Sequence, residues 1–471
     1  MHVFKTAITL IALCSINNLY AATYYVKPSG SDNANGRSHA AAWKSVKKVK
    51  NYNFKAGDDV YFLSGGKWRD QLVVRWSGTS SNRVVIGSYY MANGAEKIGV
   101  KSGAAKPILI GNYPQYNSSK AIPRSKYGSL LQVNANYVTV QNMRIENSSA
   151  NGMTLSKGFH HAIFENNEID GTAESSMLFL RKTHSNIMRK NEMKKCALRR
   201  RDKYATKWPV CNGAIGSRKN LIEKNLVTES YGEGIVAFDV GADNNIIRNN
   251  RLAVIRTIGI YVDNGSNNIV ERNIVVGEVN NKGKGDKGSA FALSVEDYPN
   301  NKDATGNIFR NNLAANTSLC MWIGMEKSAR DKGFKVGGNF IGNTCVGMKN
   351  SIIGTIPSKN YEKLTVSNNI FHDMDTNGCA FPGTSKINLE YNLWQVKQKN
   401  TNCQGNGDVI GNPKLIKTNW DNAGANNLPS ANQFKPRSGS VVYRQGISHP
   451  DLRKDFYNRN RSAIPTISAI E

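Results

Sequence analysis

The chain has 471 residues, of which 62 are Lys or Arg and 35 are Asp or Glu, so its formal net charge is +27. This excess of positive charge predicts an anionic partner, such as nucleic acid, an anionic cell surface or an acidic polysaccharide. The sequence has no aromatic-rich RNA-binding signature and no zinc-finger spacing. We therefore expect no nucleic acid among its partners.

The first 22 residues form a candidate signal peptide. Lys5 precedes an apolar stretch, and the segment ends in the small residues Ala21 and Ala22. The apolar stretch is too short to span a membrane, so we expect cleavage and no membrane insertion. The sequence thus predicts an exported protein, secreted or periplasmic, and we expect it to be a monomer.

Residues 23–106 lack the repeat of the following segment and are predicted to form an N-terminal cap with the first strands. They contain a strand and turn (TYYVKPSGSDNANG), an amphipathic helix (AAAWKSVKKVKNY) and an entry into further strands (GDDVYFLSGGKWRDQLVV). The end of a solenoid exposes apolar residues and strand edges that need a cover. We expect the helix to supply it.

Residues 107–404 carry a repeat of about two dozen residues. In each copy an asparagine closes a short apolar run and is followed by another apolar side chain. These asparagines are Asn142, Asn167, Asn191, Asn225, Asn250, Asn273, Asn312, Asn343, Asn369 and Asn392. Most are 23 to 26 residues apart, and three gaps of 31, 34 and 39 residues mark insertions. A repeat of this length is typical of a solenoid.

The residues around each asparagine predict strands. Many are β-branched or aromatic, and a glycine-containing strand candidate follows, as in EGIVAF and IGIYVD. A buried amide can bond its own bend and its neighbour in the next turn, so we expect a stacked asparagine column. The alternative is that the asparagines mark exposed turns. We predict an all-β fold, a right-handed parallel β-helix of three sheets and about ten or more coils.

One strand of each repeat is predicted to build a face with a charged edge. Aligning the repeats stacks the inward residues Met153, Met177, Ala214, Ile235, Ile260, Phe291 and Met321. Their successors point outward and are Thr154, Leu178, Ile215, Val236, Tyr261, Ala292 and Trp322. The turns that follow carry Lys157, Arg181, Lys182, Arg218, Lys219, Asp239 and Asp263. We interpret this edge as a functional site, and a solvated surface edge is the alternative.

Two insertions border this face. The first, CALRRRDKYATKWPVC, contains Arg199, Arg200, Arg201, Tyr204 and Trp208. Guanidinium groups bind carboxylates or sulfates in a bidentate manner, so we predict that this loop binds an acidic polysaccharide together with Lys157 and Trp322. A basic loop that only aids solubility is the alternative. The second insertion, GEVNNKGKGDKGSAFALSVEDYPNNKD, is predicted to form a mobile wall or lid.

Six cysteines remain after signal cleavage, and six allow fifteen pairings. They are Cys196, Cys211, Cys320, Cys345, Cys379 and Cys403. Nearest-neighbour pairing is attractive because the first two flank an insertion and the later pairs are each about one coil apart, but the sequence does not choose. The cysteines indicate an oxidising compartment, with free buried thiols as the alternative.

Residues 405–471 lose the repeat. They contain GDVIGNPKLI, then LPSANQFKPRSGSVVY, and end in a basic tail that includes DLRKDFYNRNR. We predict a C-terminal cover that lies along the last coils.

This layout resembles the secreted right-handed β-helix proteins of the pectate-lyase-like superfamily. The likeness covers nearly the whole chain after the signal and rests on YYVKPSGSDNANG, GDDVYFLSGGKWR, the NNIIRNN-type ladder and the closing SGSVVY with DFYNRNRSAIP. For a uronate polymer the resemblance implies β-elimination. A base removes the proton at C5, a cation neutralises the adjacent carboxylate, and an acid assists the leaving oxygen.

One coil, SSMLFLRKTHSNIMRKN, is similar to the coil that carries the catalytic lysine of family-six polysaccharide lyases, which include alginate lyases and chondroitinases. The likeness implies that Lys182 is the base and that Arg181, Arg218 or the arginines of the first insertion neutralise the carboxylate. The two acidic calcium ligands of that family correspond here to Met177 and Ser175. Calcium is therefore an open expectation, and no other cofactor is predicted.

A second group of candidates lies on two consecutive turns and consists of Glu233, Asp239, Tyr261 and Asp263. One interpretation is a calcium site with Glu233, Asp239 and Asp263 as oxygen ligands. Another is an acid and base pair for glycoside hydrolysis. The third is ordinary turn chemistry without a catalytic role. The seven histidines show no metal signature, and His160, His161 and His184 are interpreted as turn residues.

Three functions are compatible with these observations. The first is an exported polysaccharide lyase that acts on an acidic polymer such as alginate, pectate or a biofilm exopolysaccharide. The second is a hydrolase or epimerase on the same fold. The third is a non-catalytic protein that holds polyanions in a surface or matrix.

Overall fold

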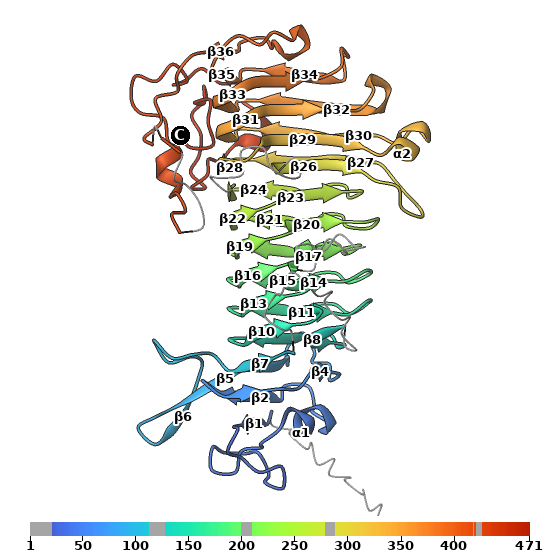
Figure 1. Cartoon of the computed structure of the whole chain (residues 1–471), viewed down its shortest axis with the longest axis vertical. Helices are drawn as coiled ribbons and strands as arrows, with labels where there is room; N and C mark the ends of the chain where they lie inside the picture. Colours follow the sequence, from blue (N-terminus) through green and yellow to red (C-terminus); the bar gives the residue numbers. More distant parts are fainter. Residues whose placement is uncertain (1–20, 113–127, 199–209, 278–287, 418, 421–425) are drawn as a thin grey trace, which may run out of the picture.

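The computed structural model describes the chain except for residues 1–20, 113–127, 199–209, 278–287, 418 and 421–425. The chain winds into a rod of stacked coils, from the blue N-terminal strands at one end of Figure 1 to the orange strands at the other. A typical coil contributes one strand to each of three parallel ladders. The predicted parallel β-helix is therefore confirmed.

Within the described residues, ladder 1 contains thirteen strands along one side of the rod. They are β1 (Thr23–Val26), β2 (Asp59–Leu63), β5 (Val84–Ala92), β9 (Val138–Gln141), β12 (Ile163–Glu165), β15 (Ile187–Arg189), β18 (Leu221–Glu223), β21 (Ile246–Arg248), β24 (Ile269–Glu271), β27 (Ala304–Arg310), β30 (Val336–Ile341), β32 (Tyr361–Ser367) and β34 (Ile387–Glu390). Strand β6 (Ala95–Ile98) pairs with β5 in the antiparallel sense.

Ladder 2 follows ladder 1 along each coil. Its strands are β3 (Lys67–Trp68), β7 (Ile108–Ile110), β10 (Arg144–Ser148), β13 (Glu168–Thr172), β16 (Glu192–Cys196), β19 (Leu226–Ser230), β22 (Arg251–Ile255), β25 (Ile274–Val276), β28 (Leu313–Ala315), β31 (Thr344–Gly354), β33 (Ile370–Ala380), β35 (Leu393–Trp394) and β36 (Val409–Ile410).

Ladder 3 completes the coil. Its strands are β4 (Leu72–Val74), β8 (Ser129–Val133), β11 (Asn151–Leu155), β14 (Met177–Phe179), β17 (Val210–Ile215), β20 (Glu233–Phe238), β23 (Ile258–Asp263), β26 (Ser289–Val295) and β29 (Leu319–Met325). The long strands β31 and β33 run through both ladders 2 and 3 and join them into one sheet.

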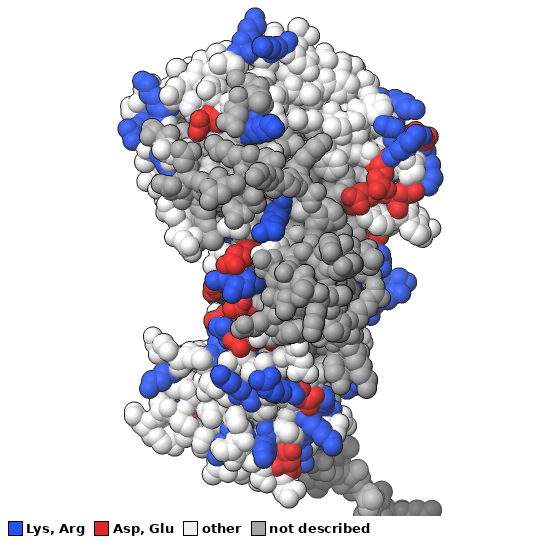
Figure 2. Space-filling view, in the orientation of Figure 1, with Lys and Arg blue, Asp and Glu red and all other residues white. Residues whose placement is uncertain are grey.

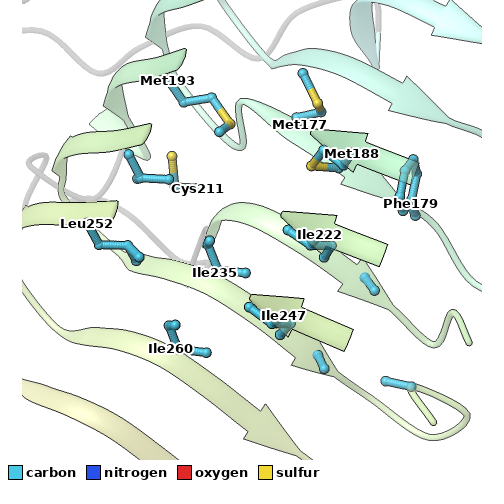
Figure 3. Close-up of a cluster of buried hydrophobic side chains, with 14 of the residues drawn as sticks. Met177, Phe179, Met188, Met193, Cys211, Ile222, Ile235, Ile247, Leu252 and Ile260 are labelled. Carbon is cyan, nitrogen blue, oxygen red and sulfur yellow. The ribbon is translucent and has the colours of Figure 1, made fainter. Parts of the chain in front are cut away.

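Inward side chains from all three ladders pack along the axis of the rod (Figure 3). Met177 and Phe179 of β14 lie near Met188 of β15, and the rings of Phe164 and Phe179 are 5.4 Å apart. Like residues stack in register, because the side chains at one strand position recur in each coil. Full burial of each large apolar side chain contributes about 1.5–3 kcal/mol.

The predicted asparagine column is confirmed from Asn167 to Asn392. The backbone N–H of Asn250, for example, donates to Oδ1 of Asn273 at 2.9 Å, and its Nδ2 donates to the same oxygen at 3.0 Å. The same Nδ2 also donates to the carbonyl of Ile222 in the preceding coil at 2.9 Å. The prediction was wrong for Asn142, which has a φ of 58° in the bend; Met143 occupies the column there.

A second asparagine column, absent from our sequence analysis, begins each ladder 1 strand in the middle of the rod. It contains Asn186, Asn220, Asn245, Asn268 and Asn307, each five residues before a member of the first column. The two columns fix both ends of the ladder 1 strands by hydrogen bonds between successive coils.

Both ends of the chain cover apolar surface. Helix α1 (Val46–Asn51) begins at Ser45, whose Oγ accepts from the N–H of Lys48, and it buries Val46 and Val49 in the main core. The 3-10 helix η3 (Thr401–Cys403) precedes β36, and the segment after β36 includes two more short 3-10 helices, η4 (Ala431–Phe434) and η5 (Pro450–Leu452). Its apolar side chains pack on the outer face of ladder 2.

This outer packing explains a change of composition along ladder 2. The first coils present ion-paired side chains outward, such as Arg144, which contacts Glu146 and Glu168. The later coils present Ile274, Leu313 and Leu393, all buried under the C-terminal segment. Two elements outside the ladders, α2 (Lys327–Asp331) and η2 (Ser358–Asn360), lie in connections from ladder 3 to ladder 1.

Candidate active site

Three exposed cations lie where successive ladder 3 strands turn toward ladder 1. They are Lys157 after β11, Lys182 after β14 and Arg218 after β17, and none forms an ion pair within the described part of the chain. The N–H of Lys182 donates to the carbonyl of Gly216 at 2.8 Å, which fixes the turn. Strands in neighbouring coils lie about 4.8 Å apart, so the three positions span roughly 10 Å. We call Lys157, Arg181, Lys182, Arg218 and Lys219 the cationic edge.

Arg181 reaches across one whole coil to Asp239. Its Nε donates to Oδ2 of Asp239, and the intervening coil presents Gly216 at the crossing point. A Cβ at Gly216 would lie 2.8 Å from Cγ of Arg181, so a glycine is needed there. The side chain of Asp239 is 6% exposed and that of Arg181 60%. Because the contact uses Nε, the terminal nitrogens can bind a carboxylate in the bidentate manner.

An acidic and aromatic cluster lies further along the same side, at the ends of β23 and β26. The hydroxyl groups of Tyr261 and Tyr298 donate to the two oxygens of Glu296, each at 2.7 Å. Asp263 is fully buried, and its Oδ1 accepts from Oγ of Ser294 at 2.9 Å and from the N–H of Glu296 at 3.1 Å. Its Oδ2 has no hydrogen-bond partner among the described atoms.

The acidic and aromatic cluster raises the pKa values of three of its members. Burial raises the pKa of the Asp263 carboxyl well above its usual value, and the neighbouring Glu296 raises it further. Burial also raises the pKa values of Tyr261 and Tyr298, and the negative charge of Glu296 adds to both shifts. The arrangement therefore favours a protonated carboxyl at Asp263 beside the carboxyl of Glu296.

The structure does not bring Glu233 together with Asp239 and Asp263. Glu233 is the first residue of β20, whereas Asp263 is the last of the neighbouring β23, and the register pairs Ile235 with Ile260. The two carboxyls thus start from opposite ends of the strands, about 16 Å apart at 3.3 Å per residue. The proposed three-ligand calcium site and the pairing of Glu233 with Asp263 are therefore wrong. Across the described ranges, no three His, Cys, Asp or Glu side chains converge to hold a metal ion.

The outer face of ladder 3 is apolar and largely buried. Leu178, Val236, Tyr261 and Ala292 stack in register there, with Trp322 half-buried at the end of the row. The ring of Trp322 lies over Gly324, whose missing side chain leaves the space.

The predicted register was wrong in one coil. Asn212, not Ala214, lies opposite Met177 and Ile235. Ala214 instead pairs with Phe179 and Ala237, and Gly213 takes the outward place assigned to Ile215. This coil follows the first insertion, where the spacing of the repeat gives no reference point.

Other candidates fall into two groups. Arg199, Arg200, Arg201, Tyr204 and Trp208 lie outside the described residues, as does the first part of the second insertion. Glu296 and Tyr298 escaped our sequence analysis, although both are in the quoted segment VEDYPNNKD. Their only sequence signal is an acidic and aromatic pair directly after a ladder 3 strand.

The three disulfides follow the nearest-neighbour pairing. Cys196 bonds Cys211 across the first insertion, and Cys320–Cys345 and Cys379–Cys403 each join adjacent coils. Such bonds are typical of proteins that fold outside the cytosol. Within the described ranges, no helix has the length and apolar character needed to cross a membrane.

Comparison with solved structures identifies the class of fold. The chain has the fold of the right-handed parallel β-helix proteins related to pectate lyases, as the resemblance implied. It is similar to pectate lyase Pel9A (13% identity, 96% of each chain covered, TM-score 0.55) and to a rhamnogalacturonan lyase (13% identity, 89% of this chain and 97% of the other covered, TM-score 0.53).

A third similar structure is XylC, solved in complex with xylose. It is 12% identical, with 95% of this chain and 98% of the other covered and a TM-score of 0.57. No protein-family model matches the sequence, and no curated protein is similar to it at a significant level.

Proposed function

We propose that this protein is an exported carbohydrate-active enzyme that cleaves an acidic polysaccharide by β-elimination. The observation that carries the proposal is the cationic edge, where exposed cations on three successive coils have no carboxylate partner among the described residues. A polymer with a carboxylate on successive sugars complements such a row. Two of the similar structures are lyases, which supports the choice of reaction.

The edge contains residues for the parts of the reaction. Lys182 is exposed at the centre of the row and is assigned as the base that removes the C5 proton. Arg181, held by Asp239, and Arg218 in the next coil neutralise the substrate carboxylate. The carboxyl charge must be neutralised because it otherwise opposes the carbanion that forms when the proton leaves.

The test is an assay for unsaturated uronate ends. The purified protein is incubated with alginate, polygalacturonate and other acidic polymers, and the ultraviolet absorbance of the unsaturated product is followed. We expect Lys182→Ala to reduce the rate about 10²–10⁴-fold, the usual contribution of a general base. Lys224→Ala is the matched control, because Lys224 is also exposed and also has a positive φ, 55° against 66° for Lys182, but lies between ladders 1 and 2. Equal loss in both variants refutes the assignment.

A second candidate reaction is glycoside hydrolysis. The specific observation is that Asp263 and Glu296 lie side by side, with the N–H of Glu296 donating to Oδ1 of Asp263, since glycoside hydrolysis uses a pair of carboxyl groups. New reducing ends without unsaturated product, lost in Glu296→Gln, would establish this reaction instead. Binding of acidic polymers with neither product would leave a matrix-binding role.

A further inference from the structure

A cluster of imidazoles adjoins the cationic edge. The rings of His160 and His184, in neighbouring coils, stack with centroids 4.8 Å apart and an interplanar angle of 19°. Nδ1 of His160 lies 2.7 Å from Nδ1 of His161, so one of the two nitrogens donates and the other accepts. His161 also stacks on Tyr137 with ring centroids 4.7 Å apart. We call His160, His161 and His184 the histidine cluster.

The cluster continues directly into the cationic edge. His184 forms a parallel backbone bridge with Arg218 of the next coil, as His160 does with His184. Two residues before His184 stands Lys182, the assigned base. The histidine cluster and the edge therefore form one surface along the connections from ladder 3 to ladder 1.

The charged groups that face the cluster are cations. Arg83, which precedes β5, donates to the carbonyls of His161 and Val138 and lies beside the ring of Tyr137. The positive charges of Arg218 and Lys219, which precede β18, lower the pKa of His184. No carboxylate of the described residues forms a hydrogen bond or ion pair with the three imidazoles. Partial burial and these neighbours lower the pKa values of His161 and His184 below the usual 6.5.

We propose that the histidine cluster is a pH-dependent extension of the cationic edge. The cluster takes up protons when a polyanion binds, and it thereby strengthens the binding of acidic polysaccharide at acidic pH. A protonated imidazole among cations is unfavourable in the free protein. A bound carboxylate or sulfate compensates the added charge, so ligand binding and protonation favour each other. The inference rests on the proposed binding of an acidic polymer at this edge.

The expected effect is a gain of affinity between neutral and mildly acidic pH. Each exposed charge pair contributes little, so two or three added charges correspond to roughly a twofold gain in affinity or more. Added salt should reduce the gain, since exposed charges are screened.

The experiment measures binding rather than activity. Dextran sulfate is the probe because its sulfates keep their charge throughout the range, and neutral dextran is the reference. Affinity is measured by titration calorimetry from about pH 7.5 to about pH 5.5, a range that spans the ordinary imidazole pKa of 6.5. The proton uptake at intermediate pH is obtained by repeating the titration in buffers with different ionisation enthalpies.

The test variant carries His160→Asn, His161→Asn and His184→Asn together. Asparagine suits these turns, because Asn136 occupies the position of His160 in the preceding coil and His161 has a φ of 56°, which asparagine tolerates. The control is His39→Asn, which removes a partly buried histidine near the N-terminal end. We expect the triple variant to lose both the gain of affinity at acidic pH and the proton uptake on binding. We expect the control to keep both.

The outcomes separate this inference from the proposed function. The inference is overturned if the wild type binds equally strongly at both pH values, or if the triple variant keeps the gain of affinity at acidic pH. Either result leaves the cationic edge as a polyanion site. Absence of binding to dextran sulfate at every pH overturns both.

Discussion

Replacing Asn250 by alanine tests how much the asparagine column stabilises the rod. Asn250 is fully buried in the middle of the column. Its Nδ2 donates to the carbonyl of Ile222 and to Oδ1 of Asn273, and its Oδ1 accepts from the N–H and the Nδ2 of Asn225. Alanine therefore removes four hydrogen bonds and leaves the buried N–H of Asn225 without this acceptor.

The magnitude follows from that count. A hydrogen bond contributes about 1 kcal/mol net, so four predict a loss of about 4 kcal/mol in the free energy of unfolding. Asn249→Gly is the matched control, because Asn249 is the adjacent, partly exposed residue with a φ of 55° that glycine also adopts. We expect the control to change stability by less than about 0.5 kcal/mol.

The assay is equilibrium unfolding in urea, followed by circular dichroism. A loss below about 1 kcal/mol for Asn250→Ala, with an unchanged dependence on urea, would show that these bonds add little beyond the strand ladders. Amide hydrogen exchange in the neighbouring coils gives a second reading, because a solenoid coil depends chiefly on its neighbours.

Three further predictions concern charged groups. Asp239→Asn should raise the KM for the acidic polymer about tenfold or more, because Arg181 loses the partner that orients it, and steady-state kinetics against wild type measures this. Asp263→Asn should raise the melting temperature at pH 8 but not near pH 4, because a carboxyl with a raised pKa costs stability only above its unfolded pKa; equal shifts at both values would contradict the reasoning. The melting temperature of the wild type should fall as pH decreases through about 6.5, because His161 and His184 bind protons more weakly in the folded state; a melting scan in which the triple histidine variant falls equally would exclude them as the cause.

The repeat made the architecture predictable, but it did not give the correct alignment of residues between strands in every coil. Spacing alone could not separate the position of Asn142 from that of Met143, because both positions of the bend accept asparagine. The position of Asn142 requires a positive φ, and the position of Met143 belongs to the asparagine column. The slip at Asn212 has a different origin, since the first insertion interrupts the count of residues before that strand. The second column could have been found, because its members stand five residues before those of the first.

The candidate site was only partly predictable, because the place of a residue along a parallel strand decides at which end of the sheet its side chain lies. Glu233 precedes the inward Ile235 by two residues, whereas Asp263 follows the inward Ile260 by three. In parallel strands these positions fall at opposite ends, so the repeat alignment already argued against the pairing of Glu233 with Asp263. Glu296 lies in an irregular connection without a repeat, and only the stacking of coils brings it to Asp263.

The C-terminal cover divides the rod into two parts with different dynamics. It packs across successive ladder 2 strands from Ile274 to Leu393, so the coils in that half are held by one common element and must open together. The coils that carry Lys157, Lys182 and Arg218 precede this half, and among the described residues the apolar side chains of the cover do not pack on them. The cationic edge therefore belongs to the part of the molecule that lies outside the cover and can open while the covered half stays closed.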